Sequence, residues 1–279
     1  MIANARMYAV AAPVAQAWRD LFAYVGERAG VAWTYIEHAA PAPVSELWAR
    51  PDCGCVFMCG FPYVSAGSRH RLLAAPVPSL PRYGGRPVYF TEFIVRDDAA
   101  FATLEQAVGG RLACMLPESN SGYNAPRHYL MTKATAGTGT LFRPTRAPTP
   151  TPRQVIDAVI GGEAEVGVVD SYVLDLLRLH EPALMARVRS VAVTPAAPIP
   201  PLVASPQAGD DTVARVRAVL LDLHRDAACA GWLAQVALSR FAPVEAPDYA
   251  VLARCASAAD QAGFELTGTP ADTGKEQRE

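Results

Sequence analysis

Apolar and polar residues follow two different patterns along the first sixty residues, one typical of strands and one typical of helices. Short apolar runs without helical spacing predict strands, whereas the longer segment 14–28 places Ala17, Leu21 and Val25 on one face of a helix. Pro43 is well placed for the first turn of a second, short helix. Strands that alternate with helices imply a mostly parallel sheet with right-handed crossovers and helices on both faces. The predicted strands of this part are residues 6–12, 31–37 and 55–59.

The same alternation continues after a Pro- and Gly-rich loop at residues 78–87. Residues 135–152 are rich in Thr, Pro and Gly and predict a long surface loop, and four prolines in residues 195–201 predict a stiff extended connection. The polar tail, residues 268–279, is expected to be disordered. Further strands are predicted at residues 71–76, 88–95, 111–116, 166–169 and 188–194, and further helices at 101–108, after 121, and at 153–160, 171–180, 213–223, 232–238 and 249–262.

The segment 117–130, PESNSGYNAPRHYL, lies between a predicted strand and a predicted helix. Its residues 119–122 supply hydroxyl and amide groups, and Gly122 lets a ligand approach the backbone closely. If the helix starts near Ser121, its first amides have no intrahelical acceptor and the helix dipole favours negative charge there. A phosphate-like group would fit this position, although the same residues also occur at an ordinary capped helix start.

Composition narrows the classes of partner. The chain has 279 residues, 51% of them hydrophobic, and a formal net charge of −2 without a stripe of Lys or Arg. This argues against nucleic acid and anionic membranes as partners, and no apolar run reaches the about 18 residues of a membrane-spanning helix. Residues 1–6 lead into a predicted strand without the features of a secretory signal. Either a leader has been lost, or the chain is a leaderless cytoplasmic protein.

The pattern Pro-x-Ser-x-Ser-Gly-Tyr at residues 117–123 resembles that of the phosphate, phosphite and phosphonate substrate-binding proteins of ABC importers. The resemblance implies an α/β fold, the two-lobed type II periplasmic-binding-protein fold, in which each lobe is a mostly parallel sheet flanked by helices and two hinge crossovers join the lobes. Lobe I would comprise residues 1–93 and 198–267, and lobe II residues 94–197. Four other segments agree in order: residues 7–10, 57–60, 89–95 and 162–170.

By the same resemblance, Ser119, Ser121 and the amide of Gly122 match the positions that hold the oxyanion. Asn120 stands where a Thr is commoner, and it still offers an amide donor. Tyr89 matches a tyrosine that contacts the ligand, although it would also suit a half-buried strand. The implied ligand site comprises Tyr89, Cys59, Ser119, Asn120, Ser121, Gly122, Tyr123, Glu165 and Asp170, with Phe61 and Tyr63 as part of its wall.

Departures from the family pattern leave the ligand open. Cys59 stands where phosphonate binders carry a tyrosine, and Glu165 stands in the place of an aspartate that meets the amino group of an aminoalkylphosphonate. The His and Glu that help to hold such ligands have no counterpart in residues 149–154. Phosphate, phosphite, a simple phosphonate or another small oxyanion therefore remain candidates. Asp170 could accept a proton from a protonated ligand oxygen, or could simply be a helix N-cap.

The cysteines suggest two further hypotheses. Cys53, Cys55 and Cys59 are poorly spaced for zinc, and six cysteines in so long a chain do not form a disulfide scaffold, so burial is the favoured interpretation. Cys59 as a nucleophile would need a histidine or a helix terminus to lower its pKa. We predict no metal, no cofactor and no catalytic residue, and no Walker-type loop, dinucleotide fingerprint or Gly-x-Ser-x-Gly motif occurs.

The functional expectation is a non-enzymatic solute-binding protein whose lobes close on a small oxyanion. The resemblance implies a monomer in the periplasm, with a membrane permease and its ATPase as partners. The alternative is a leaderless cytoplasmic ligand sensor, or an enzyme on the same fold that uses Cys59.

Overall fold

The computed structural model describes residues 1–134 and 139–268, which divide into two compact units. Unit 1 comprises residues 1–90, 171–185 and 196–253, and unit 2 comprises residues 91–170, 186–195 and the chain from Arg254 onward. This division differs from the predicted lobes, because residues 171–185 belong to unit 1 and the chain from Arg254 belongs to unit 2. The predictions for residues 135–138 and 269–279, part of a loop and most of the tail, lie outside the described residues.

Unit 1 is built on a six-stranded sheet of order β13-β4-β12-β3-β1-β2. Strand β1 pairs in parallel with β2 and β3, but β12 lies antiparallel between β3 and β4, and β13 lies antiparallel to β4. Strands β1 to β4 therefore run in one direction, and two strands from late in the chain, β12 and β13, run against them. The strands are β1 (Ile2–Asn4), β2 (Thr34–Tyr35), β3 (Cys53–Phe57), β4 (Arg71–Pro78), β12 (Leu202–Ala204) and β13 (Leu238–Ala242), with a separate pair β5 (Val88–Tyr89) and β11 (Ala197–Pro198).

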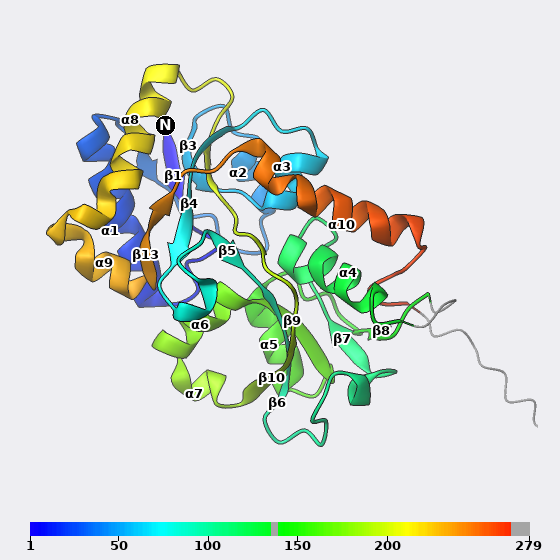
Figure 1. Cartoon of the computed structure of the whole chain (residues 1–279). Helices are drawn as coiled ribbons and strands as arrows, with labels where there is room; N and C mark the ends of the chain where they lie inside the picture. Colours follow the sequence, from blue (N-terminus) through cyan, green and yellow to red (C-terminus); the bar gives the residue numbers. More distant parts are fainter. Residues whose placement is uncertain (135–138, 269–279) are drawn as a thin grey trace, which may run out of the picture. The chain divides into compact units, whose positions relative to one another are not determined.

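Helix α1 shows why the sequence folds as it does in unit 1 (Figure 1). Pro13 occupies its first turn and Gly30 ends it in the left-handed conformation. Its apolar face buries Trp18 and Phe22, and the Trp18 ring meets Phe57 of β3 edge-on at 5.1 Å. Each such aromatic ring contributes about 1.5–3 kcal/mol by leaving water. The helices of unit 1 are α1 (Ala12–Ala29), α2 (Val44–Trp48), α3 (Gly60–Ser65), α6 (Ser171–His180), α7 (Pro182–Met185), α8 (Asp210–Asp222), α9 (Ala230–Gln235) and the start of α10 (Ala250–Gln261).

Unit 2 has a five-stranded sheet of order β10-β6-β9-β7-β8. Strands β9, β7 and β8 are parallel neighbours, whereas β6 is antiparallel to both β10 and β9. This sheet too is mixed, because β6 enters from unit 1 against the direction of the strands around it. Its elements are β6 (Thr91–Arg96), β7 (Arg111–Ala113), β8 (Arg143–Pro144), β9 (Val166–Asp170) and β10 (Val188–Val193), with a π-helical turn (Asn120–Asn124), α4 (Ala125–Met131) and α5 (Pro152–Ile160).

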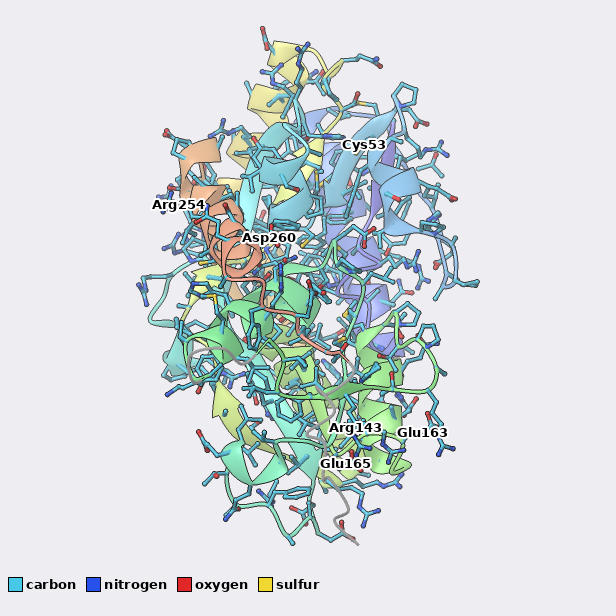
Figure 2. All side chains as sticks on the ribbon, turned by 90° about the vertical axis from the view of Figure 1, so that its right-hand side faces the viewer. Cys53, Arg143, Glu163, Glu165, Arg254 and Asp260 are labelled. Atoms are coloured by element: carbon cyan, nitrogen blue, oxygen red, sulfur yellow. The ribbon has the colours of Figure 1, made fainter. Side chains whose placement is uncertain are left out.

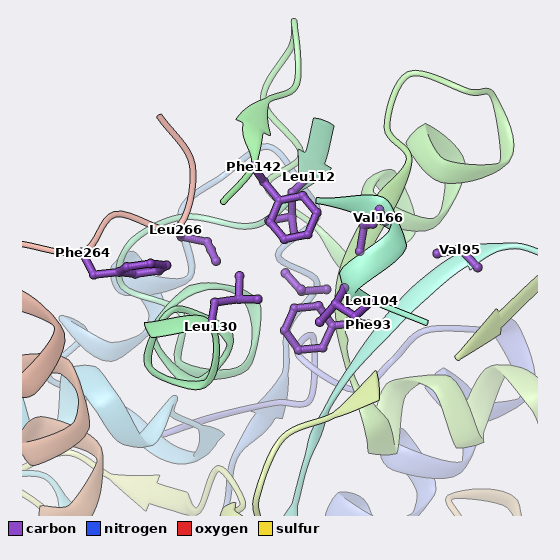
Figure 3. Close-up of a cluster of buried hydrophobic side chains, with 11 residues drawn as sticks. Phe93, Val95, Leu104, Leu112, Leu130, Phe142, Val166, Phe264 and Leu266 are labelled. Atoms are coloured by element: carbon purple, nitrogen blue, oxygen red, sulfur yellow. The ribbon is translucent and has the colours of Figure 1, made fainter. Parts of the chain in front are cut away.

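The core of unit 2 is completed from the C-terminal end of the described chain. Phe264 and Leu266 pack in one cluster with Leu130 of α4, as Figure 3 shows. Arg127, also on α4 and only 6% exposed, donates to the carbonyl of Phe264 and to Asp260, each at 2.6 Å. The prediction that the C-terminal helix packs on the first lobe therefore applies only as far as Ala253, since α10 from Arg254 onward lies in unit 2.

Several predicted elements are displaced or absent. The strand predicted at residues 6–12 is absent, because residues 6–11 form a loop, Ala12 begins α1, and β1 lies upstream of them. Tyr8 in this loop is buried because its ring contacts Phe57 and Tyr172 edge-on at 4.9 and 4.8 Å, so the apolar pattern reflects burial without ladder pairing. The helix predicted at residues 101–108 is reduced to a 3₁₀ turn at Glu105–Ala107. Within residues 1–134 and 139–268, no helix has the length and apolar character needed to cross a bilayer.

Candidate functional site

Ser119 begins the turn that the sequence marked as an anion site. Its backbone is extended, with φ −79° and ψ 130°, and its Oγ accepts a hydrogen bond from the amide of Gly122 at 3.0 Å. Ser119, not Ser121, is therefore the N-cap of this helical segment. A serine hydroxyl can accept and donate at once, so its own O–H proton stays available to an acceptor such as a ligand oxyanion.

Two amides at this helix start, those of Gly122 and Asn124, donate to Ser119. Ser119 Oγ takes the amide of Gly122, and the carbonyl of Ser119 accepts the amide of Asn124 at 3.1 Å. The Gly122 amide donates to the cap hydroxyl, so the ligand contact predicted for this amide stays a prediction. The cap hydroxyl is then the group that can face an anion.

The side chain of Met115 occupies the space beside Gly122. A Cβ at this position would lie 2.6, 2.7 and 2.8 Å from the Cβ, Cγ and Sδ of Met115. The amide of Met115 donates to the carbonyl of Gly122 at 2.9 Å, which holds the two backbones together. The missing Cβ at Gly122 therefore leaves the space that the Met115 side chain fills.

The π-helical turn that follows is fixed by buried hydrogen bonds. Asn120 and Ser121 are buried, and the carbonyl of Ser121 accepts from Thr91 Oγ1 of β6 at 2.8 Å. The side-chain amide of Asn124 donates to the carbonyls of Pro117 and Ser119 at 2.7 and 3.1 Å. Short π-helical turns occur frequently at functional sites, and this one is held rigidly against the sheet of unit 2.

Asp170 and Tyr123 have different surroundings in unit 2. Asp170 ends β9, is buried, and lies opposite Thr91 in the β6–β9 ladder. Thr91 therefore joins the end of that strand to the Ser121 carbonyl. The hydroxyl of Tyr123 donates to Glu265 at 3.3 Å, and burial together with this carboxylate raises the pKa of Tyr123. Its side chain is thus engaged with the C-terminal segment.

Glu165 and Asp170 lie at opposite ends of β9. Glu165 precedes the first residue of β9, whereas Asp170 is the last, and five extended residues span about 17 Å. Its carboxylate binds Arg111 of β7 through the guanidinium at 3.0 Å and through the backbone amide. Figure 2 labels it near Arg143 of β8, the neighbouring strand of β7. The Glu165 carboxylate is thus paired with Arg111, and its ligand role stays a prediction.

The ionisation of Glu165 reflects this pairing. Partial burial alone would raise its pKa, but the hydrogen bonds and charge of Arg111 outweigh that effect and lower it. This carboxylate joins the start of β9 to the start of β7.

Unit 1 carries the remaining predicted ligand residues. Tyr89 is only 1% exposed and pairs with Ala197 in the short β5–β11 ladder. Cys59 stands at the N-cap of α3, 7% exposed, with an extended backbone and no side-chain cap bond. The ring of Tyr63 on the same helix meets Tyr249 edge-on at 5.8 Å. Phe61 is partly exposed on the first turn of α3.

The other thiols of β3 are structural in their surroundings. Cys53 lies 3.8 Å from the carbonyl of Val203, and burial raises the pKa of its thiol to about 12. Burial also raises the pKa of Cys55. Thiolates are the species that bind zinc and attack electrophiles, so these thiols are poorly suited to either task. In the part of the chain that the structure describes, no three His, Cys, Asp or Glu residues form a group that could hold a metal ion.

No ligand-site role was predicted for Thr91, and none of its own for Ser171, although both buried polar residues adjoin the predicted site. Thr91 holds the Ser121 carbonyl, and Ser171 directly follows Asp170. Both are buried hydroxyl residues beside apolar strands. That position is the sequence signal for them, since a buried hydroxyl must find a hydrogen-bond partner.

Comparisons with known proteins agree with the fold. Across residues 10–249 the chain matches the family model described as "ABC transporter, phosphonate, periplasmic substrate-binding protein". A search of curated proteins finds no match.

Three solved structures illustrate the similarity. A binding protein component of an ABC phosphonate transporter from Pseudomonas aeruginosa is 16% identical, with 99% of this chain and 91% of that chain covered and a TM-score of 0.75. PhnD1 from Prochlorococcus marinus (MIT 9301), in complex with methylphosphonate, is 15% identical, with 94% and 98% covered and a TM-score of 0.75. A His/Glu/Gln/Arg/opine family-binding protein from Silicibacter pomeroyi, in complex with lysine, is 12% identical, with 88% and 99% covered and a TM-score of 0.54.

At these identities the solved structures show the fold alone, and the lysine complex shows that this fold serves more than one class of ligand. The prediction of a two-lobed periplasmic-binding-protein fold is confirmed. The family match, in contrast, spans most of the chain. The chain therefore belongs to the family of periplasmic substrate-binding proteins of phosphonate ABC transporters.

Proposed function

We propose that this protein binds a small oxyanion with a tetrahedral, phosphonate-like head and presents it to an ABC permease and its ATPase. The observation that carries the proposal is the Ser119 turn, in which the cap serine accepts the Gly122 amide and keeps its hydroxyl proton for an acceptor. The start of a helical segment also favours negative charge. The family match supports the transport role.

The remaining contacts are assigned by residue type and burial. Ser121, also buried in the turn, offers a second hydroxyl, and Asp170 accepts a proton from a monoprotonated ligand oxygen. Tyr89 and Cys59 of unit 1 contact the part of the ligand that carries no charge. In this proposal the two compact units are the two lobes, and ligand binding favours the closed arrangement by its differential affinity.

The engagement of Glu165 narrows the ligand class. An aminoalkylphosphonate carries an ammonium group that needs a carboxylate partner, and the carboxylate expected for it is already paired with Arg111. We therefore propose methylphosphonate, phosphite or phosphate as ligands ahead of 2-aminoethylphosphonate.

The proposal assigns no reaction to the chain, which acts as a monomer in the periplasm. The alternative of an enzyme or a cytoplasmic sensor that uses Cys59 is not supported, because the family match is to transport binding proteins. Cys59 is instead a buried wall residue at the start of α3.

Isothermal titration calorimetry of the purified chain tests the proposal. Methylphosphonate, phosphite, phosphate, 2-aminoethylphosphonate and sulfate are titrated separately, each with a matched melting curve. We expect at least one of the first three to bind at least about tenfold more tightly than 2-aminoethylphosphonate, since an unpaired buried ammonium is unfavourable. No heat and no change in Tm with any oxyanion would contradict the function, and preference for the amine-bearing ligand would contradict the ligand class.

A further inference from the structure

A buried charge cluster lies where the chain passes between the two units. Asp175 of α6, whose side chain is 4% exposed, accepts hydrogen bonds from Arg82 at 2.7 and 3.1 Å and from Arg178 at 2.9 Å. The hydroxyl of Tyr83 donates to the same carboxylate at 2.6 Å and lies 3.2 Å from Ser171 Oγ. We call Arg82, Tyr83, Ser171, Asp175 and Arg178 the Asp175 cluster.

The cluster joins two positions where the chain changes units. Phe90 is the last residue of unit 1 before β6, and Ser171 is the first residue of unit 1 after β9. The amide of Phe90 donates to Ser171 Oγ and the amide of Ser171 donates to the Phe90 carbonyl, both at 2.9 Å. The ring of Phe90 also stacks on Tyr83, with centroids 5.4 Å apart.

The same arrangement continues on the unit 2 side. Thr91 and Asp170 are the next residues of these two segments, and they face each other in the β6–β9 ladder. The amide of Thr91 also donates to Thr194 Oγ1 at 2.9 Å, next to the return of the chain to unit 1 at Ala196. Two of the segments that connect the units are thus joined by hydrogen bonds in unit 1, and three are joined in unit 2.

Three groups of the candidate ligand site lie one residue from these held positions. Tyr89 precedes Phe90, Asp170 precedes Ser171, and Thr91, which binds the Ser121 carbonyl, follows Phe90. A shift of Phe90 or Ser171 would therefore move the ligand residues directly.

The cluster is well suited to holding a position. The buried carboxylate is shared by two guanidinium groups and a phenol, so its charge is compensated and its lone pairs are used. Burial and the Asp175 carboxylate raise the pKa of Tyr83, so its hydroxyl keeps its proton as a donor. Removing one member of such a network weakens the others, because a buried polar group is left without its partner.

We propose that the Asp175 cluster is a positioning device that fixes Phe90 and Ser171 and thereby sets the ligand affinity through Tyr89, Thr91 and Asp170, without contacting the ligand. The affinity part of this inference rests on the proposed function, whereas the fixing of the passing segments does not. The residues of the cluster act through their neighbours and are not ligand residues themselves.

Tyr83→Phe tests the inference with little change in shape. It removes only the hydroxyl next to Asp175 and Ser171, and Asp175→Asn serves as a second variant that removes the charge. Leu220→Ala is the control, because Leu220 is fully buried on α8 of unit 1 and has no part in the cluster. The measurements are amide hydrogen exchange of the wild type and variants, Kd for methylphosphonate, and the Tm without ligand.

We expect the amides of Phe90 and Ser171 to exchange about tenfold faster in Tyr83→Phe, and Kd to rise about five- to tenfold, less than for a lost ligand contact, because the cluster acts on the ligand residues only through their position. Leu220→Ala should lower Tm more, yet leave both the exchange of these amides and Kd within twofold. Unchanged exchange in both cluster variants, or an equal rise of Kd in Leu220→Ala, would overturn the inference. If the wild type binds no oxyanion, the proposed function fails, and hydrogen exchange alone decides whether the cluster fixes these segments.

Discussion

The two helix starts that carry candidate ligand residues, Ser119 in unit 2 and Cys59 in unit 1, are alike in outline and different in chemistry. Each has an extended N-cap residue after a strand, and each is followed by a tightly packed glycine. A Cβ on Gly60 would lie 2.7 Å from atoms of Leu252 and Tyr249, as one on Gly122 would meet Met115. The cap bonds differ, because Ser119 Oγ accepts an amide and Cys59 makes no side-chain cap bond.

This difference indicates that the group suited to binding an anion lies at the helix start in unit 2 and not at the helix start in unit 1. Packing around the glycine shapes both turns, but only the turn in unit 2 adds a partly buried cap hydroxyl, that of Ser119, held by the Gly122 amide. The helix start in unit 1 has the apolar walls of Phe61, Tyr63 and a thiol. We therefore expect substitutions at Ser119 to change oxyanion affinity strongly and substitutions at Cys59 to change it little.

The largest effect is expected for Ser119→Ala. Loss of the hydroxyl removes one hydrogen bond to a charged ligand, so Kd for methylphosphonate should rise about 10- to 100-fold. Loss of the cap should also cost about 1 kcal/mol of stability. Titration calorimetry and thermal melts measure both quantities. Ser119→Thr keeps the hydroxyl and should stay within about fivefold of the wild type. Equal affinity in Ser119→Ala and the wild type would break the comparison.

Gly122→Ala should act on stability first. The added methyl group would stand within 2.8 Å of three Met115 atoms, and such overpacking costs about 1–3 kcal/mol. Urea unfolding of the single variant measures this loss. In the double variant Met115→Gly, Gly122→Ala all three of these Met115 atoms are absent, so the substitution of Gly122 should be nearly neutral there. A large additional loss in that background would show that the glycine serves something other than Met115.

Cys59→Ser tests the helix start in unit 1, where the N-cap residue makes no side-chain cap bond. A serine at this N-cap can accept an amide of α3, so the free energy of unfolding should rise by about 0.5–1 kcal/mol. Kd for methylphosphonate should change by less than about threefold, since the thiol only lines the wall in our proposal. A rise in Kd as large as that of Ser119→Ala would place the oxyanion contacts in unit 1 instead.

The smallest effect on binding is expected at the far end of β9. Glu165→Gln should leave Kd within twofold, because Glu165 pairs with Arg111 and not with a ligand. The lowered pKa of Glu165 stabilises the wild type above the ordinary value of 4.5, and this contribution is lost as pH falls through the folded-state pKa. The difference in Tm between wild type and variant should therefore shrink from pH 6 to pH 3. A constant difference would contradict the ion pair.

Much of the fold could be predicted where the periodicity was long and unambiguous. The helix predicted at residues 171–180 matches α6 at both ends, and the apolar spacing after residue 213 marks most of α8. Strands β12 and β13 were missed, because three to five residues in an extended, proline-flanked or post-helical context carry too little pattern. Their pairing depends on long-range contacts that no local signal reports.

The site shows a similar division. Residue types around Ser119 predicted a polar helix start, but they could not show which serine caps it or that Met115 occupies the space beside Gly122. That Glu165 precedes β9, whereas Asp170 ends it, could not be seen from a sequence correspondence, because the strand bounds are not part of it. The Asp175 cluster was missed because Arg82 and Asp175 are 93 residues apart in the sequence.

The most direct test of the central claim is an amide NMR titration of the ¹⁵N-labelled protein with methylphosphonate. We expect the largest chemical-shift changes within the Ser119–Tyr123 turn of unit 2, with smaller changes at Cys59 and none at Glu165. Saturable binding whose shifts leave the amides of this turn unchanged would contradict the account.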